Sequence, residues 1–272
     1  MRMKSKWKLI AFPLILGFLI FYVFPFGESL YYSVIESAFQ QRFVGLANYR
    51  EAIENSYYRL ALKNTLEFTV ISSAMLVCFS LCLSLALRSG GAFVRKMRIA
   101  FILPMLLPTA AIIPIFKQLF PQNALYALMQ KTGNGHLLRI PIYILYLWKN
   151  AGYNIILLST ALSLIPHEIE EAATLDGAHG LRKLFFITLP MIFPTLFFVI
   201  VLSIVQSLHV FKETYLLYGA YPDQSIYLVQ HYMNNHFAKL NYQKLTAGAI
   251  LFAIPIGLLV FGYYKSERRH NG

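Results

Sequence analysis

Apolar residues fill six long stretches of the chain, and charged residues are concentrated in the segments between them. The stretches cover residues 9–26, 68–87, 99–116, 140–165, 184–211 and 245–264, and apart from Lys149 they contain no Asp, Glu, Lys or Arg. A helix needs roughly 20 mostly apolar residues to cross a hydrocarbon core of about 30 Å, where unpaired backbone groups are not tolerated. The pattern therefore predicts an all-α, polytopic membrane protein with six transmembrane helices.

The segments between these spans differ in their content of Lys and Arg. Such residues are denser in 1–8, 88–98, 166–183 and 265–272 than in 27–67, 117–139 and 212–244. Positive residues are retained on the cytoplasmic side of a membrane, so both termini are predicted to be cytoplasmic. The basic N-terminus before an apolar run imitates a secretory signal, but no small-residue cleavage site follows Phe26, and we expect this run to be the first span.

Composition agrees with a chain that is solvated largely by lipid. The residues are 57% hydrophobic and 13% charged, and the mean hydropathy is +0.55. The net charge of +12 lies mainly at span ends, where topology and anionic membrane lipid account for it, so we expect no nucleic-acid partner. Cys78 and Cys82 lie one helical turn apart without a neighbouring His, which favours apolar packing over a metal or disulfide role.

No phosphate-binding Gly-x-x-x-x-Gly-Lys-Ser/Thr sequence occurs in the chain. We therefore expect residues 1–272 to form a single membrane domain that is no enzyme and needs no cofactor, with any ATP hydrolysis on another chain. Residues 27–67 are expected to lie along the outer membrane surface. Prolines at 104, 108 and 114 predict kinks in the third span, and Pro190 and Pro194 mark the start of the fifth.

The cytoplasmic segment 166–183 encodes a short surface helix. Pro166 suits its first position, three Glu residues favour its positive end, and Gly177 offers a terminating residue. Ile169, Ala172 and Ala173 are expected to share a small apolar side that could fit closely in a groove. These features are typical of a docking element, although an ordinary acidic loop is the alternative.

The chain contains Glu171-Ala172-Ala173, Gly177 after three further residues, and Ile187-x-Leu189-Pro190 after nine more. At these matching positions it resembles the cytoplasmic signature of ABC importer permease subunits. In that family the loop forms a coupling helix that fits a cleft on the ATPase subunit. The resemblance implies an ATPase-coupling role for Glu168, Glu171, Ala172, Ala173, Asp176, Gly177 and Pro190.

Residues 43–49, Asn64-Thr65 and Asp176-Gly177-Ala178 are similar to the larger permeases of maltose-type carbohydrate importers. Gly219-Ala220-Tyr221-Pro222 departs from the glycine-rich turn usual after the fifth span. The resemblance implies a bacterial cytoplasmic-membrane subunit that works with a second, similar permease, two cytoplasmic ABC ATPase subunits and an extracytoplasmic solute-binding protein. Import of a sugar or oligosaccharide is expected, and a sugar phosphate or other small polar solute is the alternative.

Polar side chains inside the fourth and fifth spans are the candidates for contact with solute. Such residues are costly in lipid and usually face protein or a water-filled pathway. Pyranoses offer hydroxyls to amides and an apolar face to aromatic rings. The resemblance implies a substrate pathway along these two helices, at Trp148, Asn150, Tyr153, Ser203, Gln206 and Ser207.

Helix–helix hydrogen bonding is the alternative role for each of these polar residues. Lys149 has three open interpretations: it binds an anionic substrate, pairs with a partner subunit, or extends its ammonium to the interface. A secondary transporter is disfavoured because no Asp or Glu lies inside a predicted span. A membrane scaffold would leave the loop signature unexplained, and the spacing of His231 and His236 suits no helical metal site.

Overall fold

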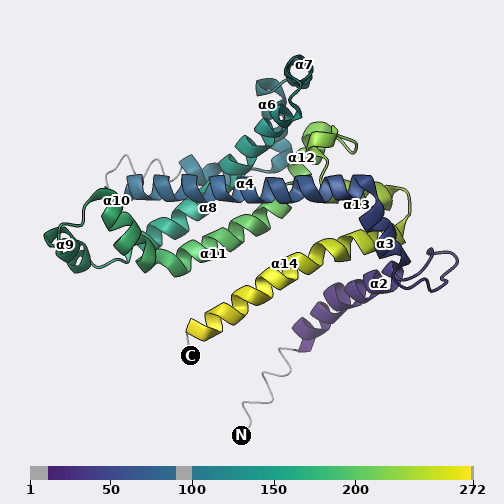
Figure 1. Cartoon of the computed structure of the whole chain (residues 1–272), viewed down its shortest axis with the longest axis horizontal. Helices are drawn as coiled ribbons and strands as arrows, with labels where there is room; N and C mark the ends of the chain where they lie inside the picture. The colour runs from purple at the N-terminus through teal and green to yellow at the C-terminus, as the bar shows by residue number, and fades with distance from the viewer. Residues whose placement is uncertain (1–11, 90–99, 271–272) are drawn as a thin grey trace, which may run out of the picture. The chain divides into compact units, whose positions relative to one another are not determined.

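The computed structural model describes residues 12–89 and 100–270, and nearly all of its regular structure is helical (Figure 1). Within these residues the only β-type pairing is an isolated bridge between Ile35 and Phe43. The all-α prediction is therefore confirmed. The extreme ends of both termini, the first part of the predicted first span and most of the loop 88–98 lie outside the described residues.

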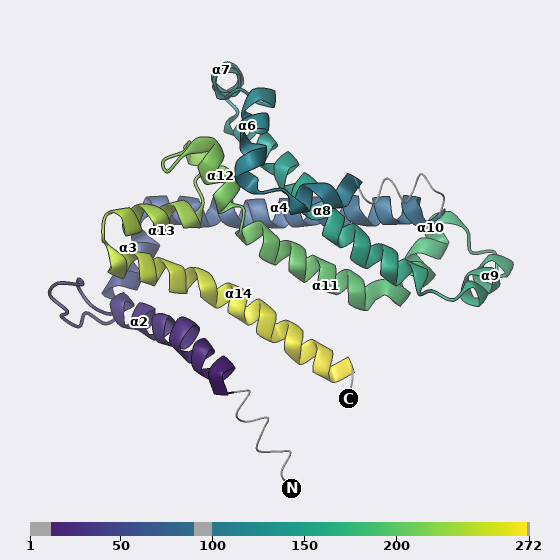
Figure 2. The ribbon, with the colours of Figure 1, turned by 180° about the vertical axis from the view of Figure 1, so that it is seen from behind.

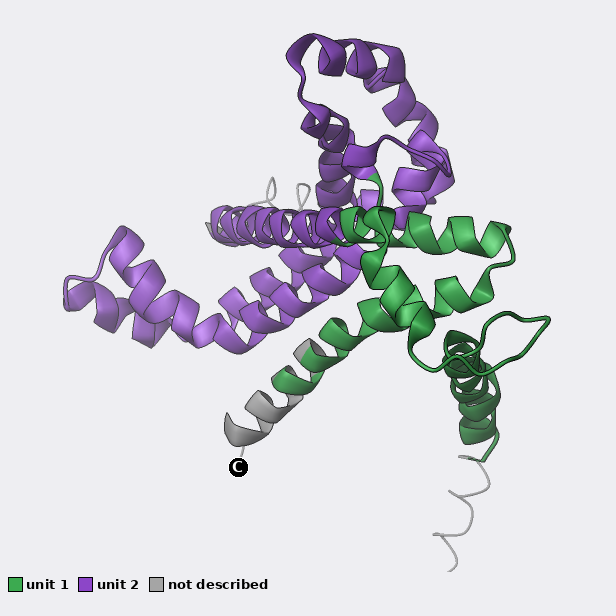
Figure 3. Cartoon of the chain, turned by 45° about the vertical axis from the view of Figure 1, so that its right-hand side comes forward, with its two compact units in different colours: residues 1–62, 227–272 green, residues 63–226 purple. Residues whose placement is uncertain are grey.

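The chain divides into two compact units (Figure 3). The first combines residues up to Leu62 with those from Tyr227 onward, and the second is Lys63–Ile226. The first unit holds helix Phe12–Ser33, which includes the π-helical turn η1 (Leu19–Val23) and α2 (Phe24–Ser33), followed by α3 (Ala47–Glu54), α13 (Val229–Ala238) and α14 (Tyr242–His270).

Aromatic and small residues form the core of the first unit. Tyr58, Ala61, Val229 and Tyr232 make one buried cluster. The Tyr58 hydroxyl donates to the carbonyl of Gly248 at 2.9 Å. Elsewhere in this unit, α2 packs along α14 in both ribbon views (Figures 1 and 2). A glycine at position 248 allows both tyrosine rings to approach, because a Cβ there would lie 3.2 Å from each.

The second unit is built around α8 and α11, which lie side by side (Figure 2). Their contact is an apolar cluster of Leu158, Leu162, Ile165, Ile192 and Val199. In chain order the elements of this unit are α4 (Ser56–Ala86, which begins in the first unit), η2 (Leu87–Ser89), helix Ala100–Leu106, α6 (Thr109–Leu119), α7 (Gln122–Thr132), η3 (Gly135–Arg139), α8 (Ile140–Ser163), α9 (His167–Leu175), α10 (Gly180–Lys183), η4 (Leu184–Thr188), α11 (Leu189–Leu208), α12 (Phe211–Tyr218) and η5 (Gln224–Ile226).

Three helices among the described residues are long and apolar enough to cross a membrane: Phe12–Ser33, Ser56–Ala86 and Gly180–Tyr218. They contain the predicted first, second and fifth spans, apart from residues 9–11 and Leu87. The predicted fourth span corresponds to α8, and α14 contains the sixth, with Tyr242–Leu258 as its apolar part. The number of spans therefore stays a prediction.

The predicted third span, 99–116, is not one continuous helix. Ala100–Leu106 and Thr109–Leu119 are bent by 112° relative to each other. Pro108 causes the break, because it has no N–H to donate and disfavours helical geometry at the preceding Leu107. Pro104 and Pro114 are accommodated inside helices, so only one of the three prolines separates two helical segments.

Candidate functional site

The segment predicted to couple to an ATPase forms α9, as expected, and a glycine follows shortly after the helix ends at Leu175. Pro166 precedes the helix in extended conformation, and Gly177 adopts φ +77°. The Ala178 N–H donates to the Ala173 carbonyl at 2.9 Å, and the Gly177 N–H donates to the Thr174 carbonyl at 3.1 Å. This pair of bonds is a Schellman motif, in which glycine is favoured because the left-handed conformation strains other residues.

The side chains of α9 face in different directions. Glu168, Glu171, Ala172 and Asp176 are exposed, whereas Ala173 is 5% exposed. The expected apolar side shared by Ala172 and Ala173 is thus wrong, because successive helical residues are rotated by about 100° and only Ala173 faces the protein. Pro190 is exposed in the first turn of α11, beyond the π-helical turn η4.

The structure singles out Glu170, which the coupling signature did not. Its carboxylate forms an ion pair with Arg88 and lies 3.9 Å from the Lys183 ammonium. Its side chain is only 18% exposed. The sequence indicated Glu170 only as one of the acids that favour the N-terminal end of the helix. Its partner Arg88 is distant in the chain, so the spacing of residues could not predict this ion pair.

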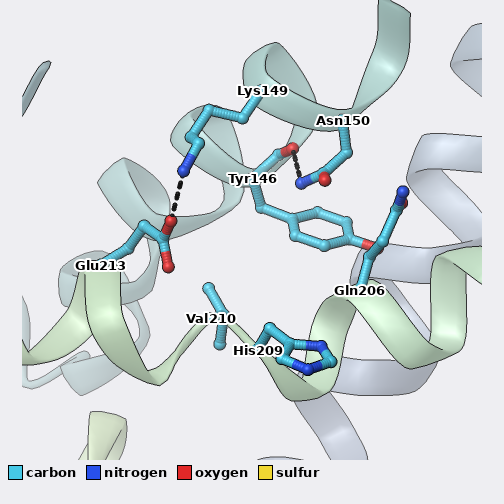
Figure 4. Close-up of a pocket in the computed structure, with 7 residues that line it drawn as sticks. All are labelled: Tyr146, Lys149, Asn150, Gln206, His209, Val210 and Glu213. Atoms are coloured by element: carbon cyan, nitrogen blue, oxygen red, sulfur yellow. Dashed lines mark hydrogen bonds and ion pairs between the residues drawn. The ribbon is translucent and has the colours of Figure 1, made fainter. Parts of the chain in front are cut away.

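A second feature is a cavity of about 190 Å³ between α8 and the segment from α11 to α12 (Figure 4). Two of the predicted pathway residues, Asn150 and Gln206, lie in its wall. The remaining lining residues are Tyr146, Lys149, His209, Val210 and Glu213. The cavity therefore combines amide, phenol, imidazole and charged groups.

The two amide side chains in the cavity wall differ in whether they form hydrogen bonds with the protein. Asn150 Nδ2 donates to the Tyr146 carbonyl at 2.8 Å. Gln206 Oε1 is shielded from solvent and accepts no hydrogen bond from any residue that the structure describes. A buried acceptor without a partner is costly, so this oxygen is suited to a water or a solute hydroxyl.

The other four predicted pathway residues do not line this cavity. Ser203 and Ser207 are buried, and they join helices: Asn154 donates to the Ser203 hydroxyl at 2.9 Å, and the Ser207 and Thr69 hydroxyls lie 3.1 Å apart. In this structure both serines act as helix–helix contacts. Trp148 and Tyr153 are partly exposed on α8, with the Trp148 ring 6.1 Å from that of Phe116.

Lys149 pairs within its own chain, a fourth possibility beside the three that the sequence suggested. Its ammonium lies 2.6 Å from Glu213 Oε1 and 2.6 Å from the Thr109 hydroxyl. Glu213 lies two residues beyond the predicted fifth span, in α12 within the helical stretch Gly180–Tyr218, so the acid that pairs with Lys149 comes from just outside the predicted spans. Thr109 is the first residue after the Pro108 break.

Comparison with known proteins decides the family. Residues 77–266 match the family described as binding-protein-dependent transport system inner membrane component. The chain belongs to this family. It is thus a permease subunit of an ABC importer, and the secondary-transporter and scaffold interpretations are set aside.

Relatives of this importer permease include proteins named for the transport of sn-glycerol 3-phosphate and of arabinooligosaccharides. The sn-glycerol-3-phosphate transport system permease protein UgpA of Rhizobium meliloti is 29% identical over 97% of this chain and 96% of its own length. The arabinooligosaccharides transport system permease protein AraP of Bacillus subtilis is 31% identical over 79% of this chain and 72% of its own. A bacterial ABC transporter involved in import of the acidic polysaccharide alginate shares the fold, with a TM-score of 0.80 at 22% identity, covering 98% of this chain and 96% of that one.

Proposed function

We propose that this permease subunit moves a neutral sugar or oligosaccharide across the bacterial cytoplasmic membrane. The observation that carries the proposal is the cavity between α8 and α11–α12, where the amide side chains of Asn150 and Gln206 suit hydroxyl-rich solutes. The AraP relative, named for arabinooligosaccharides, supports this solute class. The proposal includes six spans, cytoplasmic termini and a solute pathway that passes Asn150 and Gln206, with Trp148, Tyr153, Ser203 and Ser207 on the same helices.

The charge state of the cavity favours a neutral solute over an anionic one. The Lys149 ammonium is neutralised by Glu213 at 2.6 Å, and the side chains are only 18% and 12% exposed. Charge-assisted hydrogen bonds strengthen the recognition of a phosphate, and the Lys149 ammonium already makes its charged contact with Glu213. Sugar phosphate is the second candidate, and the relatives named UgpA support it.

We also propose that the exposed side of α9 docks on an ATPase subunit. Glu168 and Glu171 lie on the helix surface and are available to a partner, and the Gly177 turn directs the chain back toward α11. The complete assembly would contain a second permease, two ATPase subunits and an extracytoplasmic binding protein. The expected result of Glu171→Lys is loss of ATPase co-purification, because a cation replaces a carboxylate at the docking surface.

The solute is tested with the reconstituted complex in proteoliposomes that contain ATP. Arabinotriose and sn-glycerol 3-phosphate serve as neutral and anionic probes, and a panel of neutral oligosaccharides extends the test. Uptake and stimulated ATP hydrolysis with a neutral member support the proposal, whereas a response to the phosphate alone establishes the second candidate. The chain without its partners is expected to hydrolyse no ATP, and robust hydrolysis by it would contradict the subunit assignment.

A further inference from the structure

Glu170 faces the body of the second unit, whereas its neighbours Glu168 and Glu171 are exposed. Its carboxylate pairs with Arg88 and lies 3.9 Å from the Lys183 ammonium, which also donates to the Glu170 backbone carbonyl at 3.3 Å. The acids of α9 therefore fall into two groups. Two are available to a partner chain, and one is engaged within the permease.

Arg88 connects α9 to the ends of two long helices. It lies in η2, directly after α4, and one guanidinium nitrogen contacts Glu170 while another donates to the Leu162 carbonyl at 3.0 Å. Leu162 belongs to the last turn of α8, where carbonyls lack helical partners. The planar fork of arginine can serve a carboxylate and a carbonyl together. A single side chain thus joins α4, α8 and α9.

The covalent connections alone leave the orientation of α9 adjustable. On one side α9 follows Pro166, which is in extended conformation, and on the other side Gly177 and Gly180 have φ of +77° and +53°. A few residues of this kind are enough to form a hinge. In both ribbon views α9 lies beyond the ends of α4 and α8 (Figures 1 and 2). The ion pair therefore restrains a helix that its connections would let swivel.

We propose that the Glu170–Arg88 ion pair positions α9 and transmits its displacement to α4 and α8. Both are positioning residues, distinct from the docking residues Glu168 and Glu171. From Leu162, α8 leads to Asn150 in the cavity wall, about 18 Å along a rigid helix at about 1.5 Å per residue. The inference rests on the proposed docking of α9 to an ATPase subunit, and it adds the route by which docking reaches the cavity.

The test uses the complete reconstituted complex with Glu170→Gln, Arg88→Gln and the double variant. Each is expected to retain the ATPase subunits, because Glu168 and Glu171 are unchanged. The ratio of ATP hydrolysis with solute-loaded binding protein to hydrolysis without it should fall at least about fivefold, the lower end of usual allosteric coupling. The double variant should lose no more than either single variant, because all three remove the same interaction.

Arg88→Lys keeps the charge but lacks the planar fork whose two terminal nitrogens contact Glu170 and the Leu162 carbonyl separately, so it should give an intermediate ratio. This variant also keeps the test decisive if Arg88→Gln assembles poorly. The matched control is Glu54→Gln, which breaks the exposed Arg50–Glu54 pair at 2.8 Å on α3 and should leave the ratio unchanged.

A wild-type ratio in Glu170→Gln, or losses that add in the double variant, would overturn the inference while leaving the importer assignment intact. Failure of the proposed function gives a different result. In that case Glu171→Lys would keep its ATPase subunits, or the wild-type complex would show no stimulation with any probe.

Discussion

Gln206 contributes a shielded side-chain oxygen to the cavity, and the described residues leave that oxygen without a hydrogen bond. Gln206→Leu removes this acceptor at similar volume. Because a solute hydroxyl is expected to donate to this oxygen, uptake by proteoliposomes should fall about two- to twelvefold, which corresponds to the loss of a net hydrogen bond of about 0.5–1.5 kcal/mol. Asn150→Leu should act in the same direction, although its amide already donates to Tyr146.

Ser203→Ala is the control for Gln206→Leu, because Ser203 lies on the same helix but contacts Asn154 rather than the cavity. It should lower thermal stability while leaving uptake per assembled complex near normal. Equal uptake by Gln206→Leu and wild type would remove Gln206 from the pathway.

His231 makes stability depend on pH in the first unit. It is fully buried in α13, and burial lowers its pKa from 6.5 to about 4. Between pH 6.5 and 4 this histidine is protonated in the unfolded chain but neutral in the folded chain. The free energy of unfolding therefore falls as the pH decreases toward 4. Between pH 7.5 and 5 the loss is on the order of 2 kcal/mol. Thermal unfolding across this range measures it, and His231→Gln should flatten the dependence. An unchanged slope in that variant would assign the effect to other groups.

At the scale of elements, Gly152 allows α8 to approach helix Ala100–Leu106 closely. A Cβ at this position would lie 2.2 Å from the Phe101 carbonyl oxygen, and backbone cannot rotate away as a side chain can. Gly152→Ala should therefore push the two helices apart and cost about 1–3 kcal/mol, as overpacking does. The fall in Tm of the purified subunit measures this.

Gly257→Ala is the matched control for Gly152→Ala. Gly257 lies in α14, and a Cβ there meets nothing within 4 Å. Alanine is the better helix former, so this substitution should be neutral or slightly stabilising. If both variants unfolded at the same temperature, the close approach of Gly152 to Phe101 would not contribute to the stability of the subunit.

Local sequence signals predicted individual elements well and their contacts poorly. Pro166 and Gly177 located the ends of α9, with Pro166 one residue before the helix rather than at its first position, because caps depend on residues close in the chain. The three prolines of the predicted third span looked alike in the sequence, yet only Pro108 separates two helices, beside the threonine that Lys149 contacts. The partners of Glu170 and Lys149 depend on how helices pack, which no spacing along the chain encodes.

For the whole molecule, the predicted topology places α9 in the cytoplasm and the segment after α12 outside. Leu175 is 88% exposed and Tyr221 is 69% exposed, so each accepts a reporter without disturbing packing. In a variant without Cys78 and Cys82, Tyr221→Cys should react with an impermeant maleimide added to intact spheroplasts. Leu175→Cys should react only after the membrane is opened. The reverse labelling pattern would show that the orientation is opposite to the predicted one. Reaction of both cysteine variants from outside would contradict the predicted number of spans between the two positions.

The pairing of Lys149 with Glu213 also bears on how the chain enters the membrane during synthesis. A lysine at mid-helix opposes insertion, at about 2.5–3.5 kcal/mol on translocon scales, and α8 is not among the helices apolar enough to span on composition alone. The neutralising carboxylate lies 64 residues later. At roughly 5–20 residues per second, the ribosome makes it about 3–13 seconds after the lysine. We therefore expect α8 to remain at the insertion machinery until α12 has emerged, so that the predicted fourth and fifth spans enter the lipid together.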